Sequence, residues 1–408
     1  MKTSFPKEKI KILLLEGIHQ SAAEEFNSAD YRAEIRKSAL NEDQLSELIP
    51  SVHILGIRSR TQITPRVLKQ ARRLLAIGCF CIGTNQVALK EARTAGTVVF
   101  NAPFSNTRSV AELTMAEIVM LARKAVQRSI ELHQGRWEKT AAGSYEVRNK
   151  TVGIIGYGHI GPQVGLLAEA FGMKVIFYDI VPKLPLGNAR PAGSLQEVLR
   201  EADFVTLHVP ETDQTRGMIS SEELKVMKEG SYLLNLSRGS VVDLDALAEA
   251  IKSGHLAGAA LDVYPEEPAA RVDSFNSVVC GLPNVILTPH VGGSTVEAQQ
   301  AIGREVASSL IKFLDTGSTS GAVNFPQVEL PLLDRDCHRI LNIHRNVPGV
   351  MRDINNIIAD TGVNIEAQYL STMDNIGYLI MDVGKDISRE VKKRIDSLEA
   401  SIRTRLLF

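Results

Sequence analysis

The fold of the middle of the chain is predicted from one motif, residues 152–161, VGIIGYGHIG. A short apolar run predicted as a buried strand leads directly into three spaced glycines, and a helical pattern follows. Gly156 allows a tight turn, Gly158 lets a ligand approach the backbone, and Gly161 lets the helix pack closely on the strand. Because glycine-rich turns are common, the motif indicates a ligand site only through the strand and helix that flank it.

An acidic residue, Asp179, ends the next predicted strand, KVIFYD at 174–179. The start of the intervening helix offers N–H groups and a positive dipole end to a pyrophosphate. Asp179 is expected to hydrogen-bond an adenosine ribose and to repel a 2′-phosphate. We therefore predict NAD as the cofactor in preference to NADP, with Lys183 the one nearby basic residue that opposes this preference. The alternative is a structural βαβ turn that binds no ligand.

Strands alternate with helices on both sides of this motif. Such alternation is typical of parallel sheets covered by helices on both faces. Two longer helical patterns, 109–134 and 295–314, are long enough to carry the chain between two domains. We predict a substrate-binding domain over residues 1–106 and 295–317, and an NAD-binding domain over residues 107–294.

The C-terminal part of the chain differs from the rest in composition and in the order of its predicted elements. Glycine, serine, threonine and proline are frequent from residue 315 onward, and we predict a linker over 318–335. Residues 336–408 follow the order β-α-β-β-α-β of the ferredoxin-like motif. The predicted fold class is α/β: two doubly wound parallel-sheet domains, of Rossmann or flavodoxin-like type, and a C-terminal ferredoxin-like domain.

Bulk properties argue against several classes of protein. A net charge of −1 gives no reason to expect nucleic acid or an acidic membrane as a partner. The four cysteines have neither paired metal spacing nor the density of a disulfide framework, so we expect no metal and reduced thiols. No apolar run approaches the roughly 20 residues that span a bilayer, and a signal-peptide pattern is absent. We predict a cytoplasmic protein.

Polar residues follow several predicted strands of the middle domain. Ligands of doubly wound sheets bind beyond the carboxyl ends of the strands, so we expect these side chains to converge on one crevice. The alternative for each of them is an isolated loop residue without a role in a site. They are Asp179, His208, Ser237, Arg238, Asp262 and His290.

Three side chains near these strand ends suit the oxidation of a 2-hydroxy acid. The reaction needs a base for the hydroxyl proton, a cation for the carboxylate and an acid that sets the pKa of the base. His290 suits the base, Glu267 its acidic partner, and Arg238 offers a forked donor that matches a carboxylate. A single histidine or arginine is more often structural. Three of them beside a dinucleotide motif favour catalysis.

The glycine motif, LNLSRGSVVD (234–243), ALDVYPEEP (260–268) and LTPHVGGST (287–295) resemble signatures of the D-isomer-specific 2-hydroxyacid dehydrogenases. The resemblance implies catalytic roles for Arg238, Glu267 and His290. Glu266 is an alternative to Glu267, but the position before proline favours Glu267. Many relatives carry alanine where this chain has Leu236, a change that leaves a backbone contact intact. The expected cofactor-binding residues are Gly156, Gly158, His159, Ile160, Gly161, Asp179, His208, Leu236, Ser237, Arg238, Asp262, His290, Val291, Gly292 and Gly293.

Two segments of the first domain suggest a substrate with two anionic ends. The stretch 56–61, GIRSRT, ends one predicted strand and 77–85, IGCFCIGTN, ends another. N–H groups around Gly83 suit a carboxylate, and Arg60 suits a second anion. The alternative is that Arg58 and Arg60 are solvated surface charges.

Segments 77–87, IGCFCIGTNQV, and 100–112, FNAPFSNTRSVAE, resemble the phosphoglycerate dehydrogenase branch that ends in a short regulatory domain. This resemblance implies NAD-dependent oxidation of D-3-phosphoglycerate to 3-phosphohydroxypyruvate, the first step of L-serine biosynthesis. Reduction of 2-oxoglutarate to 2-hydroxyglutarate is a possible side activity. Substrate contacts are expected at Arg60, Gly83, Asn106 and Arg108, and, at a neighbouring subunit's site, from Lys37, Trp137 and Lys139. The alternatives are a glyoxylate or hydroxypyruvate reductase of the same family, or an NAD-sensing regulator without catalysis.

The C-terminal stretch HRNVPGV, residues 344–350, resembles an ACT domain. A Pro-Gly turn before a helix leaves N–H groups for a ligand carboxylate. The resemblance implies L-serine as a feedback inhibitor, bound by His344, Asn346 and Asn364. A purely structural dimerisation domain is the alternative. The long helix and the ACT domain suggest two kinds of dimer contact and hence a homotetramer.

Overall fold

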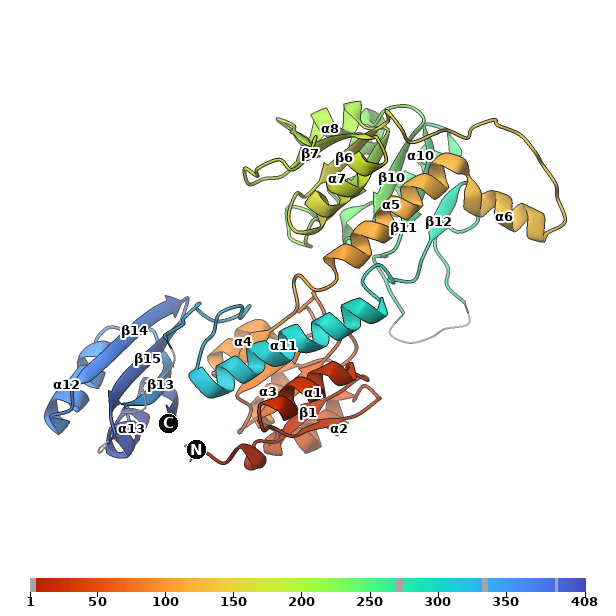
Figure 1. The fold of residues 1–408 in the computed structure, drawn as a ribbon. Helices are drawn as coiled ribbons and strands as arrows, with labels where there is room; N and C mark the ends of the chain where they lie inside the picture. The colour runs from red at the N-terminus through yellow and green to blue at the C-terminus, as the bar shows by residue number, and fades with distance from the viewer. Residues whose placement is uncertain (1–4, 269–273, 332–336, 386–387) are drawn as a thin grey trace. The chain divides into compact units, whose positions relative to one another are not determined.

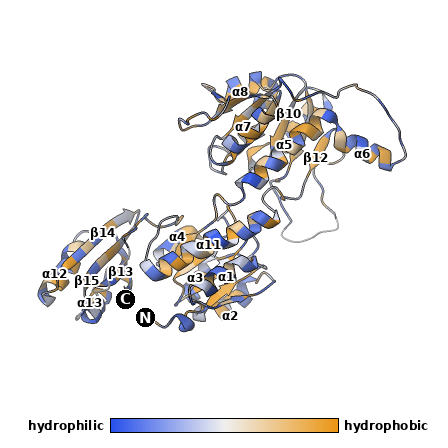
Figure 2. Cartoon of the chain, in the orientation of Figure 1, coloured by the Kyte–Doolittle hydropathy of each residue, from blue (hydrophilic) through white to orange (hydrophobic). Residues whose placement is uncertain are grey.

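The computed structural model describes residues 5–268, 274–331, 337–385 and 388–408 (Figure 1). These residues form two compact units, one of Met1–Ser105 with Gln299–Phe408 and one of Asn106–Ala298. Asn106 and residues 295–298, which we expected in the substrate-binding domain, lie in the second unit. In each unit the apolar residues gather on the strands, while polar residues dominate the outer helix faces (Figure 2).

The first unit contains a five-stranded parallel sheet in the order β2-β1-β3-β4-β5. Helix α1 (Gln20–Ser28) packs on one face, and the other face is covered by α2 (Glu42–Leu48), α3 (Pro65–Gln70) and α4 (Leu89–Thr94). Burial on both faces explains the nearly continuous apolar runs of the sequence. The strands are β1 (Ile12–Leu14), β2 (Ala33–Ile35), β3 (Ile54–Ile57), β4 (Ala76–Cys79) and β5 (Val98–Phe100).

Helix α11 (Val296–Thr316) brings the chain back to this sheet on the side of α1. A Cβ on Gly78 of β4 would lie 2.7 Å from Val306, so glycine lets the helix pack directly on the strand. The predicted linker is packed as well. Asn324 accepts from Val99 N–H and donates to the Thr97 carbonyl, which holds this segment against β5.

The second unit contains a seven-stranded parallel sheet in the order β12-β11-β10-β9-β6-β7-β8. The strand order reverses between β6 and β9, which makes that position the switch point where ligands bind. Helices α5 (Thr107–Arg123) and α7 (Ile160–Ala170) cover one face, and α8 (Leu195–Glu201), α9 (Ser221–Val226) and α10 (Leu244–Lys252) cover the other. The strands are β6 (Thr151–Ile155), β7 (Lys174–Tyr178), β8 (Arg190–Pro191), β9 (Phe204–Leu207), β10 (Ser231–Asn235), β11 (Leu256–Leu261) and β12 (Val285–Leu287).

The single helix expected over 109–134 is two helices. Helix α5 (Thr107–Arg123) ends at Lys124, whose φ of 51° and ψ of 33° are left-handed, and α6 (Ala125–His133) follows. A left-handed residue cannot continue the hydrogen-bond ladder of a right-handed helix, so the chain changes direction there. The apolar spacing alone gave no sign of this break.

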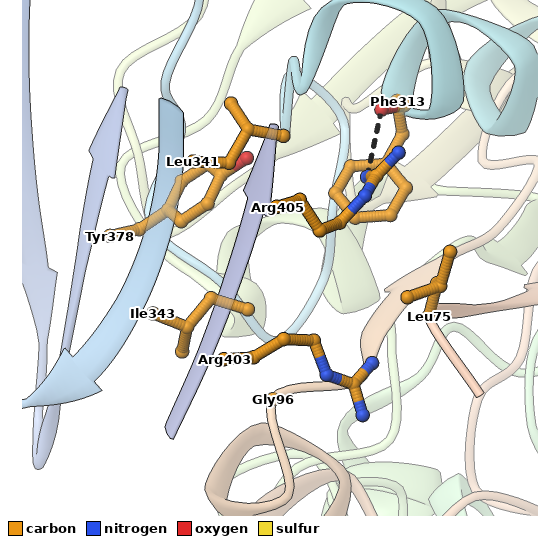
Figure 3. A pocket seen from close by; sticks show the side chains of 8 residues that line it. All are labelled: Leu75, Gly96, Phe313, Leu341, Ile343, Tyr378, Arg403 and Arg405. Carbon is orange, nitrogen blue, oxygen red and sulfur yellow. Dashed lines mark hydrogen bonds between the residues drawn. The ribbon is translucent and has the colours of Figure 1, made fainter. Parts of the chain in front are cut away.

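The C-terminal sheet is antiparallel, in the order β14-β15-β13-β16. With helices α12 (Val350–Thr361) and α13 (Ser388–Asp396) it forms the expected βαββαβ unit. Strand β16 faces the end of α11, where Arg405 donates to the Phe313 carbonyl (Figure 3). Arg405 also donates to the Leu314 carbonyl, and Arg403 donates to that of Leu74. The remaining bounds are β13 (Cys337–Arg345), β14 (Ile365–Met373), β15 (Ile376–Gly384) and β16 (Ser401–Leu407).

The predicted α/β fold class, with two parallel sheets and a ferredoxin-like domain, is confirmed. Within the ranges given above, no helix is long and apolar enough to cross a membrane.

Candidate active site

The turn after β6 is an open cradle at the switch point of the seven-stranded sheet. Gly156 has a φ of 92°, and a Cβ there would lie 2.3 Å from the carbonyl oxygen of His208. A Cβ on Gly161 would lie 2.6 Å from the carbonyl oxygen of Gly156, whereas Gly158 faces open space. The first and third glycines therefore permit close packing, and the second leaves room for a ligand. Ile160 opens α7 directly behind the turn, and the exposed His159 precedes it.

Asp179 borders a pocket of about 350 Å³ beside this cradle, lined by residues 177–183 and 191–193. Its Oδ2 accepts from Tyr157 N–H at 2.8 Å and its Oδ1 accepts from Val181 N–H at 2.9 Å. The carboxylate is thus fixed by two main-chain donors at the mouth of the pocket. Open space at Gly158, an N-terminal helix end and a fixed acid together fit an adenine dinucleotide.

His208 follows β9, opposite the glycine turn. Its Nε2 lies 3.0 Å from Thr206 Oγ1, and its buried Nδ1 meets no hydrogen-bond partner within the ranges the structure describes. Burial lowers the pKa of His208 to about 3, so the ring is neutral. An unsatisfied buried nitrogen at this position also fits a bound polar ligand.

The imidazole of His290 and the carboxylate of Glu267 form a hydrogen-bonded pair. His290 Nδ1 lies 2.7 Å from Glu267 Oε2, and Glu267 Oε1 accepts from Tyr264 N–H at 3.2 Å. About half of the His290 side chain is exposed, so the rest of the ring is accessible. With Nδ1 occupied by the carboxylate, Nε2 is the nitrogen that remains to exchange a proton with a substrate.

The two side chains of this pair shift each other's pKa values in opposite directions. The hydrogen bond with Glu267 raises the pKa of His290 against the effects of burial and of the Arg238 charge. Burial is the largest single effect on Glu267 and works to raise its pKa, but the hydrogen bond and charge of His290, the Tyr264 N–H and the Arg238 charge together lower that pKa. The carboxylate therefore stays charged and stabilises an imidazolium beside it.

Asp262, which is buried at the end of β11, fixes the loop that carries the histidine. It accepts from Thr288 Oγ1 at 2.6 Å and from the main-chain N–H groups of Val291 and Gly292 at 2.8 Å each. Glu117 of α5 is buried nearby; burial first, and the Asp262 charge second, raise its pKa to about 8. Glu117 is thus largely neutral at pH 7 and leaves the negative charge to Asp262.

Two residues that the sequence did not single out, Asn235 and Gly239, position the turn that carries Arg238 near the Glu267–His290 pair. Asn235, fully buried at the end of β10, donates to the Arg238 carbonyl and accepts from Ser237 N–H and Oγ–H. A Cβ on Gly239 would lie 1.9 Å from the carbonyl carbon of Tyr264, so glycine lets the Arg238 turn touch the loop that leads to Glu267. The signals were an asparagine ending an apolar strand and a glycine directly after the arginine.

The other cofactor and substrate residues predicted in this unit differ in burial and in the residues that they contact. Leu236 and Ser237 are buried between β10 and the Arg238 turn. A Cβ on Gly293 would lie 2.2 Å from Nδ2 of Asn106, which places that asparagine against the histidine loop. Exposed positions are occupied by Arg108, which pairs with Glu112, and by Trp137 and Lys139 in the loop after α6.

The predicted substrate residues of the first unit lie at one edge of its sheet. Lys37 follows β2, Arg60 follows β3 and Gly83 follows β4. The carboxyl ends of parallel strands meet at the same edge, and about half of the Arg60 side chain is exposed there.

The three predicted serine ligands of the C-terminal domain have different environments. His344 is buried, its Nδ1 lies 3.0 Å from Asn342 Oδ1, and burial lowers its pKa. Asn346 is exposed and donates to the Asp374 carbonyl, whereas Asn364 is exposed and donates to Glu366. The three are not brought together within one copy of the domain.

Known proteins resemble both parts of the chain. A family model described as D-isomer specific 2-hydroxyacid dehydrogenase, NAD binding domain, matches residues 115–292, and one described as AHAS small subunit-like ACT domain matches residues 340–403. The D-3-phosphoglycerate dehydrogenase of Dictyostelium discoideum is 54% identical over 406 residues, covering 100% of this chain and 99% of its own. That of Escherichia coli strain K12 is 52% identical over 410 residues and covers 100% of both chains. The crystal structure of a D-isomer specific 2-hydroxyacid dehydrogenase from Lactobacillus delbrueckii, in its NAD-complexed form, has a TM-score of 0.66 at 26% identity, covering 74% of this chain and 97% of that one.

With this fold, this site and these relatives, the chain belongs to the D-isomer-specific 2-hydroxyacid dehydrogenases. The two relatives named above match it along its whole length, and both are D-3-phosphoglycerate dehydrogenases. The predictions of family, of an NAD-dependent oxidoreductase and of an ACT domain are confirmed.

Proposed function

We propose that this chain oxidises D-3-phosphoglycerate to 3-phosphohydroxypyruvate with NAD, the first step of L-serine biosynthesis. The observation that carries the proposal is the 2.7 Å pair of Glu267 and His290, held near Arg238 in a unit with a dinucleotide cradle. Full-length similarity to enzymes named for this reaction supports the choice of substrate.

In the proposed mechanism, the glycine turn at 156–161 and Asp179 would hold NAD, which would supply the hydride acceptor for the carbon that bears the hydroxyl group. His290 Nε2 takes the hydroxyl proton, and Glu267 stabilises the resulting imidazolium through Nδ1. Arg238 binds the substrate carboxylate with its forked guanidinium. Asp262 and Asn235 bind no substrate atoms in this scheme; they fix the two loops on which His290 and Arg238 lie.

We assign the remaining contacts from the resemblance and from the two predicted anion sites of the first unit. Arg60, Asn106 and Arg108 lie near the substrate, with Arg60 at its phosphate end, and the N–H groups around Gly83 bind the carboxylate end. Lys37, Trp137 and Lys139 reach the site of a neighbouring subunit in a homotetramer; all three are exposed and available for such contacts. The enzyme works in the cytoplasm. It also reduces 2-oxoglutarate as a side activity, because that substrate, like the main one, has two anionic ends.

The reaction is tested by following NADH absorbance with 3-phosphohydroxypyruvate, hydroxypyruvate, glyoxylate and 2-oxoglutarate. We expect kcat/KM for the phosphorylated acid to exceed that for hydroxypyruvate by at least about 100-fold, because two anion sites are filled instead of one. Equal activity with unphosphorylated acids would make the chain a hydroxypyruvate or glyoxylate reductase. Tight NAD binding without turnover of any acid would make it a sensor.

L-Serine is proposed as a feedback inhibitor that binds between two ACT domains. Asn346 bonds to the turn after β14, whereas Asn364 precedes this nine-residue strand, so about 30 Å separates them. One small ligand therefore reaches both side chains only when two domains lie side by side. To inhibit the enzyme, L-serine must bind one arrangement of its domains more tightly than another.

Replacement of Asn346 and Asn364 by alanine is expected to abolish inhibition by L-serine while kcat stays unchanged, because both side chains lie in the ACT domain. The measurement is a serine titration of initial rates, with Asn355→Ala on α12 as the control. Unchanged potency of serine in the double variant would rule out this binding site.

A further inference from the structure

The turn after β1 contains a buried acid, Glu16, that the proposed mechanism does not use. The residue is only 3% exposed. Its φ of 62° is a left-handed backbone conformation, which is uncommon for residues other than glycine. A buried carboxylate is costly unless donors surround it, so its partners indicate what the position is for.

Among the residues that the structure describes, this carboxylate accepts from three main-chain groups, all in the loop after β3. Glu16 Oε1 accepts from the main-chain N–H groups of Arg58 and Thr61, at 3.2 and 2.9 Å, and Oε2 accepts from that of Arg60 at 3.0 Å. The Nε of Arg60 lies 4.0 Å from Oε2. One side chain thus determines the backbone path of the 58–61 loop and places a negative charge behind the arginine.

The same turn also holds the neighbouring loops at this edge of the sheet. Glu16 N–H donates to the Ser38 carbonyl, and Gly17 N–H donates to the Arg36 carbonyl, on either side of Lys37. Buried Gln86 donates to the Arg58 carbonyl at 2.7 Å and to the Gly83 carbonyl at 3.2 Å. The turn at Glu16 therefore joins the loop after β2 to the 58–61 loop after β3, and Gln86 joins the 58–61 loop to the loop after β4.

We propose that Glu16 is a positioning residue that selects for phosphorylated substrates: it fixes the 58–61 loop so that Arg60 presents its guanidinium to an anionic group of the substrate. About half of the Arg60 side chain is exposed, and no hydrogen bond engages its two terminal nitrogens within the described part of the chain. A guanidinium oriented from behind and open in front is suited to a phosphate. This inference rests on the proposed function, which assigns Arg60 to the phosphate end.

The test compares Glu16→Gln with the native enzyme on two substrates. Glutamine has the same shape, but its NH₂ group would face main-chain donors that need an acceptor, so the loop loses its fixed path. We expect KM for 3-phosphohydroxypyruvate to rise about 10- to 100-fold with kcat nearly unchanged. The kcat/KM for hydroxypyruvate, which lacks the phosphate, should stay within about threefold, and Glu16→Asp should recover part of the loss.

Two controls separate positioning from general damage. Glu34→Gln removes an exposed acid on β2 of the same sheet and should behave as native enzyme. Combining Glu16→Gln with Arg60→Ala should be no worse than Arg60→Ala alone, because Glu16 acts through Arg60. Equal losses on both substrates, or additive losses in the double variant, would overturn the proposal.

Failure of the proposed function would be recognised separately, since the native enzyme itself would then show no preference for the phosphorylated acid. In that case inorganic phosphate is the probe, as an inhibitor of hydroxypyruvate reduction. Weaker inhibition in Glu16→Gln would still support the role of Glu16 in anion binding, and an unchanged inhibition constant would overturn it.

Discussion

Replacement of His290 by glutamine is expected to lower kcat by about 10²- to 10⁴-fold, because the reaction then lacks its general base. Nδ1 of His290 is hydrogen-bonded to Glu267 at 2.7 Å, so the ring is oriented with Nε2 available for the hydroxyl proton. A glutamine side chain can form similar hydrogen bonds, but it cannot take up a proton near neutral pH.

Steady-state rates with 3-phosphoglycerate, together with calorimetric titration of NAD, measure this effect. His133→Gln, at the exposed end of α6, is the matched control and should retain native activity. NAD affinity should change little in His290→Gln, since the loop is held by Asp262 and not by the imidazole. A variant that keeps more than about a tenth of native kcat would mean that another group is the base.

Replacement of Glu267 by glutamine is expected to lower kcat by about 10²-fold or more and to move the pH profile. The hydrogen bond with Glu267 raises the pKa of His290, so a neutral amide in its place lowers that pKa. Oxidation requires neutral His290 and increases as pH rises through its pKa, so this limb should move to lower pH. Reduction requires the imidazolium and decreases through the same pKa, so its loss of activity should also begin at lower pH.

The pH dependence of kcat/KM in both directions distinguishes this role from simple structural support. Glu266→Gln, at the exposed adjacent acid, serves as the control and should leave the profile in place. A profile that stays unchanged in Glu267→Gln but moves in Glu266→Gln would reverse the assignment of the two glutamates.

Local patterns in the sequence predicted the elements that position the site. The strand–glycine–helix unit at Gly156, the acid at Asp179 and the β-α-β-β-α-β order of the last domain all occur as expected. These features depend on near neighbours in the chain, because strand period, glycine conformation and helix starts are set within a few residues. The break at Lys124 was missed because a left-handed residue there changes no apolar spacing.

Several contacts between distant segments were not predicted. Nothing in the local sequence indicates that Asn324 pairs with β5, that Gly239 touches Tyr264, or that Glu16 accepts three N–H groups from the loop after β3. Each contact joins positions that are separated by many residues, and hydrogen bonds of this kind leave no periodic signal in either segment.

The sequence by itself determined the order of elements, the glycine cradle for NAD, and the candidates Arg238, Glu267 and His290, because residue type and spacing carry that information. Only the tertiary structure decided that Glu267 meets His290 at 2.7 Å, that buried Asp262 and Asn235 hold the loops of His290 and Arg238, and that buried Glu16 holds the loop of Arg60 in the first unit. The physical reason is that a buried polar group must find its partners wherever folding brings them, which is a property of the whole sheet and not of the local chain.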